Sequence, residues 1–401
     1  MHLFFSVGEP SGDQHAAHLM EALRARDPQA RFSGFGGPLM AQAGLEELYR
    51  LSNLAVMGLV GIAPLLGTFF RLLKQADEFL KQNRPDGVVL IDYPGFNWWI
   101  ARKAKQLGIP VYYYCAPQLW AWGGWRIHKM RKLVDCVLSV LPFEAEWFAQ
   151  QGLRVEYVGH PFFDEAARHQ LQTTATIDGP NSSIKRFDYL TAAGESPSRL
   201  VGILPGSRDQ EVRRNFPTMI EAMRRLSAQH PDLRFAVACY KEAHRATCQQ
   251  LLQDHQGDEL PVTLLVGQTP EIVAWSECVL MVSGSVSLEL LARGTPAVVT
   301  YRGGTVMWLI AMLLIKCPYA SLPNLIAGRE LFPEVLYKNN PEIAVERIVK
   351  IMNNWLSNPA ELAAVREESL TLRDRVATTG GLARAADFFV REHATLVRRA
   401  A

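Results

Sequence analysis

Short apolar runs alternate with amphipathic stretches along most of this chain. Runs such as His2–Val7, Gly87–Ile91 and Leu200–Leu204 carry little or no charge and end at Gly, Pro or Asp. This pattern is typical of strands buried on both faces of a parallel sheet. Helical spacing follows several of them, as in Gln14–Ala25. Because strand and helix alternate in both halves, the pattern predicts an α/β fold with two doubly wound, Rossmann-like domains.

A polar segment separates the two halves. Residues 170–197 are poor in large apolar side chains and rich in Thr, Ser, Gly and Asn, which indicates a surface insertion or linker. We therefore expect an N-terminal domain at residues 1–168, a linker at 169–198, a second domain at 199–365 and a helical tail at 366–401 that crosses back over the domain boundary. Ligands bind at the carboxyl ends of strands in such sheets, so we expect the sites to face an interdomain cleft.

Two long uncharged stretches stand out in the hydropathy pattern. Leu51–Phe70 could span a membrane by length, but four residues, Gly58, Gly61, Pro64 and Gly67, interrupt it. The stretch predicts either an apolar flap with short helices that insert into one face of a bilayer, or an ordinary core helix. Gly303–Ile315 is too short to span a bilayer and predicts a buried or interfacial helix.

Composition excludes several classes of protein. The 401 residues, 48% of them hydrophobic and 20% charged, suit a globular protein of two domains. A net charge of +2 gives no support for nucleic-acid binding. The six cysteines form no Cys-x-x-Cys pair, and the start shows no signal-peptide pattern, so we expect a cytosolic protein with reduced thiols.

The clearest candidate for an anion site opens the second half. After Leu200–Leu204, Gly206 stops the strand, and Ser207 can cap a helix that starts near Asp209. Free backbone N–H groups and the positive end of the helix dipole then point at one spot. Arg208 lies at that spot, and its planar fork suits two phosphate oxygens. The alternative is an ordinary turn with a surface arginine.

A second turn repeats this arrangement further along the chain. The strand Cys278–Val282 leads into three small residues, Ser283, Gly284 and Ser285, and then into a helix. Glu289 follows one helical turn later. Its carboxylate could accept two hydrogen bonds from a ribose diol, or it could be the glutamate of a capping box.

The first half offers a turn and a carboxylate at strand ends. The turn Gly8–Asp13 follows the first strand but lacks the Gly-x-Gly-x-x-Gly pattern of dinucleotide sites. Asp92 follows the strand Gly87–Ile91, where a carboxylate can serve as a general base. It could equally cap the next helix, expected at Trp98–Leu107.

The loop Ala116–Trp125 is unusually aromatic. Trp120, Trp122 and Trp125 lie beside two glycines and a basic cluster, a combination that can bind sugar faces or a lipid headgroup layer. The basic cluster could also be a solvated helix face. The chain has no Asp-x-Asp, His-Glu-x-x-His or Gly-x-Ser-x-Gly motif. We therefore expect no metal site, and a nucleotide diphosphate would have to be neutralised by arginine and helix dipoles.

An ordered set of motifs along nearly the whole chain resembles the lipid-A-disaccharide synthase family. The motifs are Gly8-Glu-Pro-Ser-Gly-Asp13, Ala55-Val-Met-Gly58, Ile91-Asp-Tyr-Pro-Gly-Phe-Asn97, Pro117-Gln-Leu-Trp-Ala-Trp122, Leu141-Pro-Phe-Glu144, Gly159-His-Pro161, Leu204-Pro-Gly-Ser-Arg208, Ser283-Gly-Ser285 with Glu289, and Ser321-Leu-Pro-Asn-Leu-Ile-Ala-Gly-Arg-Glu330. Each motif is weak alone, and the ordered set is specific.

The resemblance implies an inverting glycosyltransferase of the GT-B type that needs no cofactor. Such enzymes join UDP-2,3-diacylglucosamine to 2,3-diacylglucosamine 1-phosphate through a β-1,6 bond and release UDP. Asp92 would take the proton from the acceptor hydroxyl, Gly206–Arg208 and Ser283–Ser285 would hold the diphosphate, and Glu289 would hold the ribose. Further residues implied on the acceptor or donor side are Glu9, Ser11, Gly12, Asp13, Asn97, Trp122, Asn324 and Arg329.

The resemblance also implies a place in the cell. The two uncharged stretches would bind the acyl chains of the substrates. The protein would be peripheral, at the cytoplasmic face of the inner membrane. The resemblance is compatible with an oligomer. The alternatives are another UDP-sugar enzyme, such as a hexosamine epimerase or a transferase with a soluble acceptor, and a non-catalytic sugar-nucleotide binder at the membrane.

Overall fold

The chain forms two compact units. The computed structural model describes residues 1–51, 62–169, 171, 174–176, 183–185, 199–304, 317–376 and 379–400. One unit comprises Met1–Asp164 together with Thr378–Ala401, and the other comprises Glu165–Ala377. The first unit therefore ends at Asp164, where the sequence predicts a domain end at residue 168, and its C-terminal part begins at Thr378, where the sequence predicts a tail from residue 366. The C-terminal segment thus belongs to the same unit as the N-terminus.

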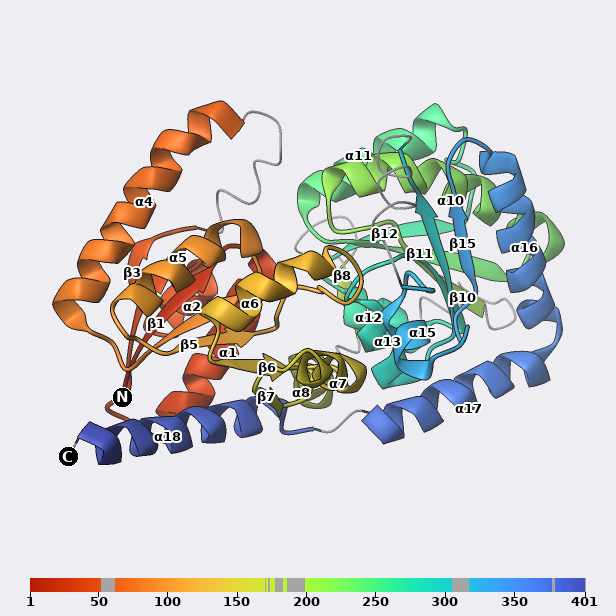
Figure 1. Ribbon diagram of the computed structural model, residues 1–401. Helices are drawn as coiled ribbons and strands as arrows, with labels where there is room; N and C mark the ends of the chain where they lie inside the picture. Colours follow the sequence, from red (N-terminus) through yellow and green to blue (C-terminus); the bar gives the residue numbers. More distant parts are fainter. Residues whose placement is uncertain are drawn as a thin grey trace. The chain divides into compact units, whose positions relative to one another are not determined.

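The first unit is built on a parallel sheet of seven strands in the order β3-β2-β1-β4-β5-β6-β7 (Figure 1). The order reverses between β1 and β4, which is the switch point where doubly wound sheets bind ligands. The strands are β1 (His2–Val7), β2 (Arg31–Phe35), β3 (Glu46–Tyr49), β4 (Gly87–Ile91), β5 (Val111–Tyr114), β6 (Cys136–Ser139) and β7 (Val155–Tyr157).

Helices cover this sheet and connect its strands. They are α1 (Pro10–Arg24), α2 (Pro38–Gln42), α4 (Ile62–Asn83), α5 (Pro94–Gln106), the short η1 (Gly124–Arg126), α6 (Ile127–Leu133), α7 (Pro142–Gln150), α8 (Pro161–Arg168) and α18 (Gly381–Ala400). Helix α4 buries Leu72, which is 1% exposed, and leaves Phe70 59% exposed. No helix in the described part of the chain is both long and apolar enough to cross a bilayer.

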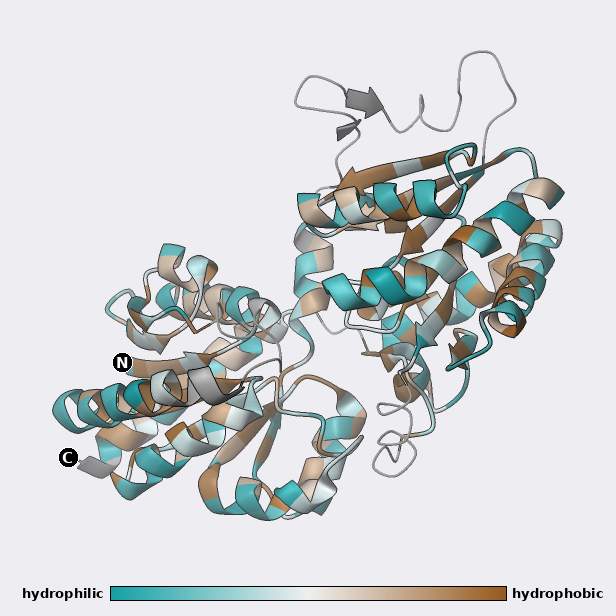
Figure 2. Ribbon diagram, turned by 90° about the horizontal axis from the view of Figure 1, so that it is seen from above, coloured by the Kyte–Doolittle hydropathy of each residue, from teal (hydrophilic) through white to brown (hydrophobic). Residues whose placement is uncertain are grey.

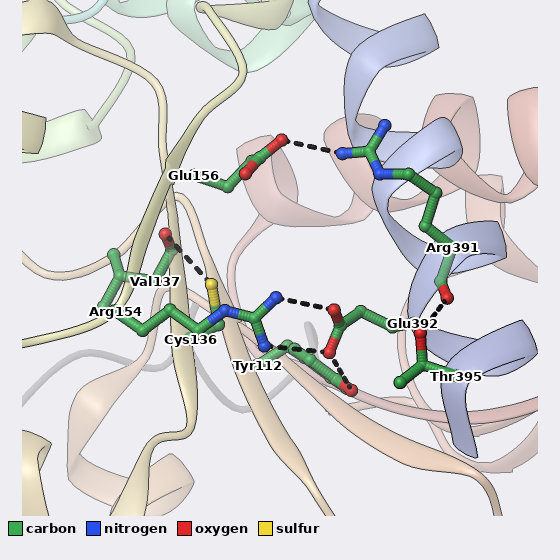
Figure 3. A network of polar contacts seen from close by, with 8 residues as sticks. All are labelled: Tyr112, Cys136, Val137, Arg154, Glu156, Arg391, Glu392 and Thr395. Carbon is green, nitrogen blue, oxygen red and sulfur yellow. Dashed lines mark hydrogen bonds and ion pairs between the residues drawn. The ribbon is translucent and has the colours of Figure 1, made fainter. Parts of the chain in front are cut away.

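The last helix, α18, is tied to the strands of the first unit by charged groups (Figure 3). Glu392 accepts two hydrogen bonds from Arg154, at 3.0 and 2.6 Å, and Arg391 donates to Glu156 at 2.8 Å. At the start of the helix, the Asp164 carboxylate accepts from the backbone N–H groups of Gly380 and Leu382, at 2.5 and 2.8 Å. These contacts explain why α18 packs on the N-terminal unit.

The second unit contains a parallel sheet of six strands in the order β12-β11-β10-β13-β14-β15. Its strands are β10 (Arg199–Leu204), β11 (Leu233–Cys239), β12 (Val262–Val266), β13 (Cys278–Val282), β14 (Ala297–Arg302) and β15 (Glu334–Tyr337). The helices are α10 (Asp209–Gln229), α11 (Glu242–Asp254), α12 (Thr269–Trp275), α13 (Ser287–Arg293), α15 (Leu322–Ala327), α16 (Pro341–Ser357) and α17 (Pro359–Val376). Figure 2 shows largely hydrophobic strands with hydrophilic helix faces outside them.

The predicted α/β fold with two doubly wound sheets is confirmed. Within the predicted linker, Thr174–Thr176 (β8) pairs antiparallel with Ser183–Lys185 (β9). The remainder of 170–197, apart from residue 171, lies outside the described residues, as do residues 52–61 and 305–315 of the two uncharged stretches. Residues 62–70 of the first stretch form the beginning of α4.

Candidate functional site

Two turns meet at the carboxyl edge of the first sheet. Strands β1 and β4 pair with Val7 opposite Ile91, so the turn after β1 lies beside the turn that carries Asp92. A Cβ atom on Gly12 would lie 3.3 Å from Asp92 Oδ2 and 2.8 Å from a methyl group of Val7. Glycine is therefore required at position 12 for the first turn to approach the Asp92 carboxylate.

The backbone around Asp92 is held in an unusual conformation. Asp92 and Tyr93 have φ angles of 47° and 39°, in the left-handed region that non-glycine residues rarely adopt. The carbonyl of Asp92 accepts hydrogen bonds from the Asn97 amide at 2.8 Å and from the Tyr113 hydroxyl at 2.6 Å. The N-cap residue of α5 is Tyr93, without a side-chain cap. The capping interpretation of Asp92 is therefore wrong.

The Asp92 carboxyl group is poised to exchange a proton near neutral pH. Burial, together with the negative charges of Glu9 and Glu144, raises the pKa of Asp92 from 3.8 to about 7. A carboxylate of this basicity can accept a proton from a hydroxyl group in the transition state far better than an ordinary aspartate.

Asn97 joins the two strands beneath the site. It is fully buried, and its Nδ2 donates to the carbonyls of Ser6 and Ile91 at 3.2 and 3.1 Å, as well as to that of Asp92. Its Oδ1 accepts from the Ser6 hydroxyl at 2.6 Å. With these partners inside the protein, Asn97 fixes the position of Asp92.

Truncating this amide should be costly for folding. We expect Asn97→Ala to lower the free energy of unfolding by about 2–4 kcal/mol, because it leaves the Ser6 hydroxyl and several buried carbonyls without their partner. Urea unfolding measures the change. Asn83, whose amide donates to the Phe79 carbonyl at an exposed helix end, is the matched control. Asn83→Ala should cost less than about 0.5 kcal/mol, and equal losses in both variants would contradict the proposed role.

Other predicted residues of this turn have different environments. Asp13 is buried, and its carboxylate accepts from the backbone N–H groups of Leu39 and Met40, both at 3.0 Å, so it caps α2. Ser11 is exposed and Glu9 partly exposed at the start of α1. The structure thus brings Glu9 and Gly12 toward Asp92 and uses Asp13 to connect two helices.

A buried glutamate anchors the aromatic loop. Glu144 accepts hydrogen bonds from the Ser139 hydroxyl at 2.7 Å and from the Trp120 indole at 3.2 Å, and burial raises its pKa to about 7. Trp122 in the same loop is 46% exposed, with the Arg126 guanidinium 4.0 Å from its ring centre. The loop therefore presents a fixed aromatic surface that can contact a sugar or a lipid.

The two small-residue turns of the second unit share one sheet edge. Strands β10 and β13 pair with Leu204 opposite Met281, which places the turns Gly206–Arg208 and Ser283–Ser285 side by side. Helix α10 begins at Asp209, as predicted, but its N-cap is Arg208. The expected cap by Ser207 is wrong, because the Glu211 carboxylate binds the N–H groups of this turn instead.

Glu289 is buried in the first turn of α13. Its Oε1 accepts from Arg293 at 3.3 and 3.2 Å, and burial raises its pKa, opposed by the charge of Arg293. The N-cap of α13 is Val286, without a side-chain cap, so the capping-box interpretation is wrong. In the neighbouring turn, the Ser283 hydroxyl donates to the Ala320 carbonyl at 2.7 Å.

The last two predicted residues differ in exposure. Asn324 is fully buried, accepts from the N–H groups of Leu331 and Phe332, both at 2.8 Å, and donates to Glu334 at 2.8 Å. It thus holds together the loop between α15 and β15. Arg329 forms an exposed ion pair with Glu368 at 2.9 Å.

Sequence reasoning gave no role to three residues that shape these sites: Tyr113, Glu144 and Glu211. Tyr113 acts on Asp92, 21 positions earlier, and Glu144 binds Trp120, 24 positions earlier, so local patterns did not indicate these contacts. Glu211 had a signal in its spacing, three residues after the helix cap, but the usual capping pattern has Ser or Thr where this chain has Arg208. Among the described residues, no group of three His, Cys, Asp or Glu side chains could hold a metal ion.

Comparison with known proteins gives matches along most of the chain. Residues 3–376 match the family described as lipid-A-disaccharide synthetase. The lipid-A-disaccharide synthase of Myxococcus xanthus (strain DK1622) is 34% identical over 386 residues, which cover 95% of this chain and 94% of that protein. That of Alcanivorax borkumensis is 38% identical over 360 residues, with coverage of 90% and 89%.

Solved structures resemble the fold at low sequence identity. A putative UDP-N-acetylglucosamine 2-epimerase from Listeria monocytogenes has a TM-score of 0.64 at 14% identity, covering 97% of this chain and 94% of that chain. CalG4, the calicheamicin glycosyltransferase, has a TM-score of 0.59 at 16% identity, covering 98% of both chains. At these identities the likeness shows the GT-B fold alone.

Proposed function

This chain belongs to the lipid-A-disaccharide synthase family, and on that premise we propose that it joins UDP-2,3-diacylglucosamine to 2,3-diacylglucosamine 1-phosphate. The reaction forms a β-1,6-linked disaccharide 1-phosphate and releases UDP. The family match makes the chain a glycosyltransferase, so neither an epimerase nor a silent binder is favoured.

The first unit supplies the base in this proposal. Asp92 removes the proton from the 6-hydroxyl of the acceptor as that oxygen attacks the anomeric carbon of the donor, and the bond to UDP breaks. A single displacement of this kind inverts the anomeric centre. The observation that carries the assignment is Asp92, whose backbone carbonyl is held by Asn97 and Tyr113 and whose carboxyl group has a pKa of about 7.

The second unit binds the nucleotide in this proposal. Arg208 and the N–H groups of the Gly206 turn neutralise the diphosphate as it leaves, and the Ser283 turn assists from the neighbouring strand. Glu289 accepts hydrogen bonds from the ribose diol. The side chains of Asn97, Asp13 and Asn324 support these sites from within the protein.

We further infer peripheral attachment to the cytoplasmic face of the inner membrane, because the substrates carry acyl chains. The exposed aromatic side chains of the first unit support this inference. Phe70 is 59% exposed on α4, Trp99 is 42% exposed on α5, and Arg102 lies 5.0 Å from the ring centre of Trp99. Aromatic rings beside cations are typical of proteins that contact lipid headgroups.

The direct test of the reaction uses the purified full chain and both diacyl sugars. Mass spectrometry should detect the disaccharide 1-phosphate, and a coupled assay should detect an equal amount of UDP. UDP release without disaccharide would indicate hydrolysis of the donor instead of transfer. Absence of both products with folded protein would refute the proposal.

The pH dependence should report the Asp92 carboxyl group. We expect kcat/KM to fall about tenfold per pH unit below an inflection near pH 7, because only the deprotonated base accepts the hydroxyl proton. Glu9→Gln removes the nearby charge that raises the Asp92 pKa most, so the inflection should move to lower pH. An inflection near pH 4 in the unaltered protein, or one that Glu9→Gln moves upward, would contradict the assignment.

A further inference from the structure

The turn proposed to bind the donor diphosphate is already occupied by a carboxylate of the protein. Glu211 Oε2 accepts from the backbone N–H groups of Ser207 and Arg208, at 3.2 and 3.3 Å. Glu211 Oε1 accepts from the Arg208 guanidinium at 3.0 Å. One side chain thus engages the main donors that a phosphate group would use at this turn.

Gly206 makes room for this carboxylate. Its φ angle is +123°, a conformation that favours glycine. A Cβ atom at position 206 would lie 2.6 Å from Glu211 Cβ and 2.8 Å from Glu211 Oε2. The glycine therefore serves two purposes, because it forms the turn and admits the Glu211 side chain into it.

The contact is built so that it can open. The Arg208 side chain is 73% exposed, while that of Glu211 is 13% exposed. The two backbone hydrogen bonds are long, since one lies at the upper limit of the usual range and the other just beyond it. Because the Arg208 member of this ion pair is exposed to solvent, the pair contributes little stability, so a diphosphate with more charge can replace the carboxylate.

We propose that Glu211 is a displaceable internal anion that competes with the donor diphosphate and thereby sets the affinity for UDP. This inference rests on the proposed function, since it takes the Gly206 turn as the diphosphate site. UDP can bind only after Glu211 has left the turn. The apparent affinity for UDP is therefore the intrinsic affinity multiplied by the fraction of molecules in which the turn is open. After transfer, the return of Glu211 promotes the release of UDP.

A purely structural capping box makes the opposite prediction. In that case Glu211 orients Arg208 and the N–H groups for the ligand, and removing its charge weakens UDP binding. Glu211→Gln separates the two, because glutamine keeps the length of the side chain and loses the negative charge. The same variant should leave the affinity for uridine unchanged, because uridine has no phosphate to compete with Glu211.

The experiment is calorimetric titration of the full chain with UDP and with uridine. We expect Glu211→Gln to bind UDP about five- to tenfold more tightly and uridine within twofold of the unaltered protein. The inhibition constant of UDP in the disaccharide assay should fall by the same factor. Glu221→Gln is the matched control, since Glu221 pairs with Arg224 three residues away on the same helix, and it should change neither affinity.

The outcomes distinguish this inference from the function on which it rests. Unchanged or weaker UDP binding by Glu211→Gln would overturn the inference while leaving the proposed function intact. If the unaltered protein neither binds UDP nor forms disaccharide, the proposed function and the inference both fail. Glu211→Asp provides a second variant should the glutamine variant not fold, because its shorter carboxylate reaches the turn less well and should also tighten UDP binding.

Discussion

Replacing Asp92 with asparagine should reduce turnover about 10³-fold while UDP still binds with unaltered affinity. Asparagine has nearly the same shape but cannot accept the hydroxyl proton, and removing a general base typically costs two to four orders of magnitude in rate. Asp92 belongs to the first unit, whereas the residues that we propose to bind the nucleotide belong to the second. Disaccharide formation under saturating substrates measures the first effect, and calorimetry with UDP measures the second.

The same substitution should stabilise the fold at alkaline pH. The pKa of Asp92 is about 7 in the folded protein, above the ordinary value of 3.8, so the folded state favours the protonated form. Protonated Asp92 therefore stabilises the folded protein at low pH, and this contribution is lost as the pH rises from about 4 to about 7. At pH 8 we expect Asp92→Asn to raise the free energy of unfolding by about 2 kcal/mol. A variant that is inactive and less stable would instead indicate a damaged fold.

Replacing Arg208 with alanine should have the second largest effect on activity. We expect kcat/KM to fall about 10²–10³-fold, because the guanidinium neutralises charge that grows on the diphosphate as the bond to the sugar breaks. UDP binding should weaken as well, whereas the stability of the protein should hardly change, since the Arg208 side chain is 73% exposed.

An arginine on the same helix provides the control for this variant. Arg224 pairs with Glu221 at the same spacing at which Arg208 pairs with Glu211. Arg224→Ala should therefore leave kcat/KM within about twofold. If Arg208→Ala behaves like Arg224→Ala, the diphosphate is bound elsewhere and the assignment of the Gly206 turn is wrong.

Most strands of both sheets could be predicted from the sequence because they are short, apolar and buried on both faces. The exceptions are β3 (Glu46–Tyr49) and β15 (Glu334–Tyr337), which lie at the edges of their sheets. Edge strands are short and carry charged residues, so their hydropathy resembles that of a loop. The boundary of the first unit was also hard to predict, because Asp164 is fixed by residues at the start of α18, more than two hundred positions later.

The candidate sites were predictable where a strand end determines them. Asp92 and Gly206 each follow a buried strand, and parallel pairing brings the neighbouring turns to the same edge. The partners that hold these residues were not predictable, because Asn97 binds Ser6 and Asn324 binds Phe332 only after the chain has folded. Glu211 was missed for another reason, since its spacing fits a capping box but Arg208 stands where the usual pattern has Ser or Thr.

The configuration of the new glycosidic bond tests the central claim most directly. A single displacement assisted by Asp92 must invert the anomeric centre of the UDP-linked sugar. We predict that, in proton NMR of the purified disaccharide 1-phosphate, the anomeric proton at the new linkage shows only the large coupling of a β-1,6 bond. An α-linked product, or a mixture of both anomers, would contradict direct attack by the acceptor hydroxyl and with it the role of Asp92 as the base.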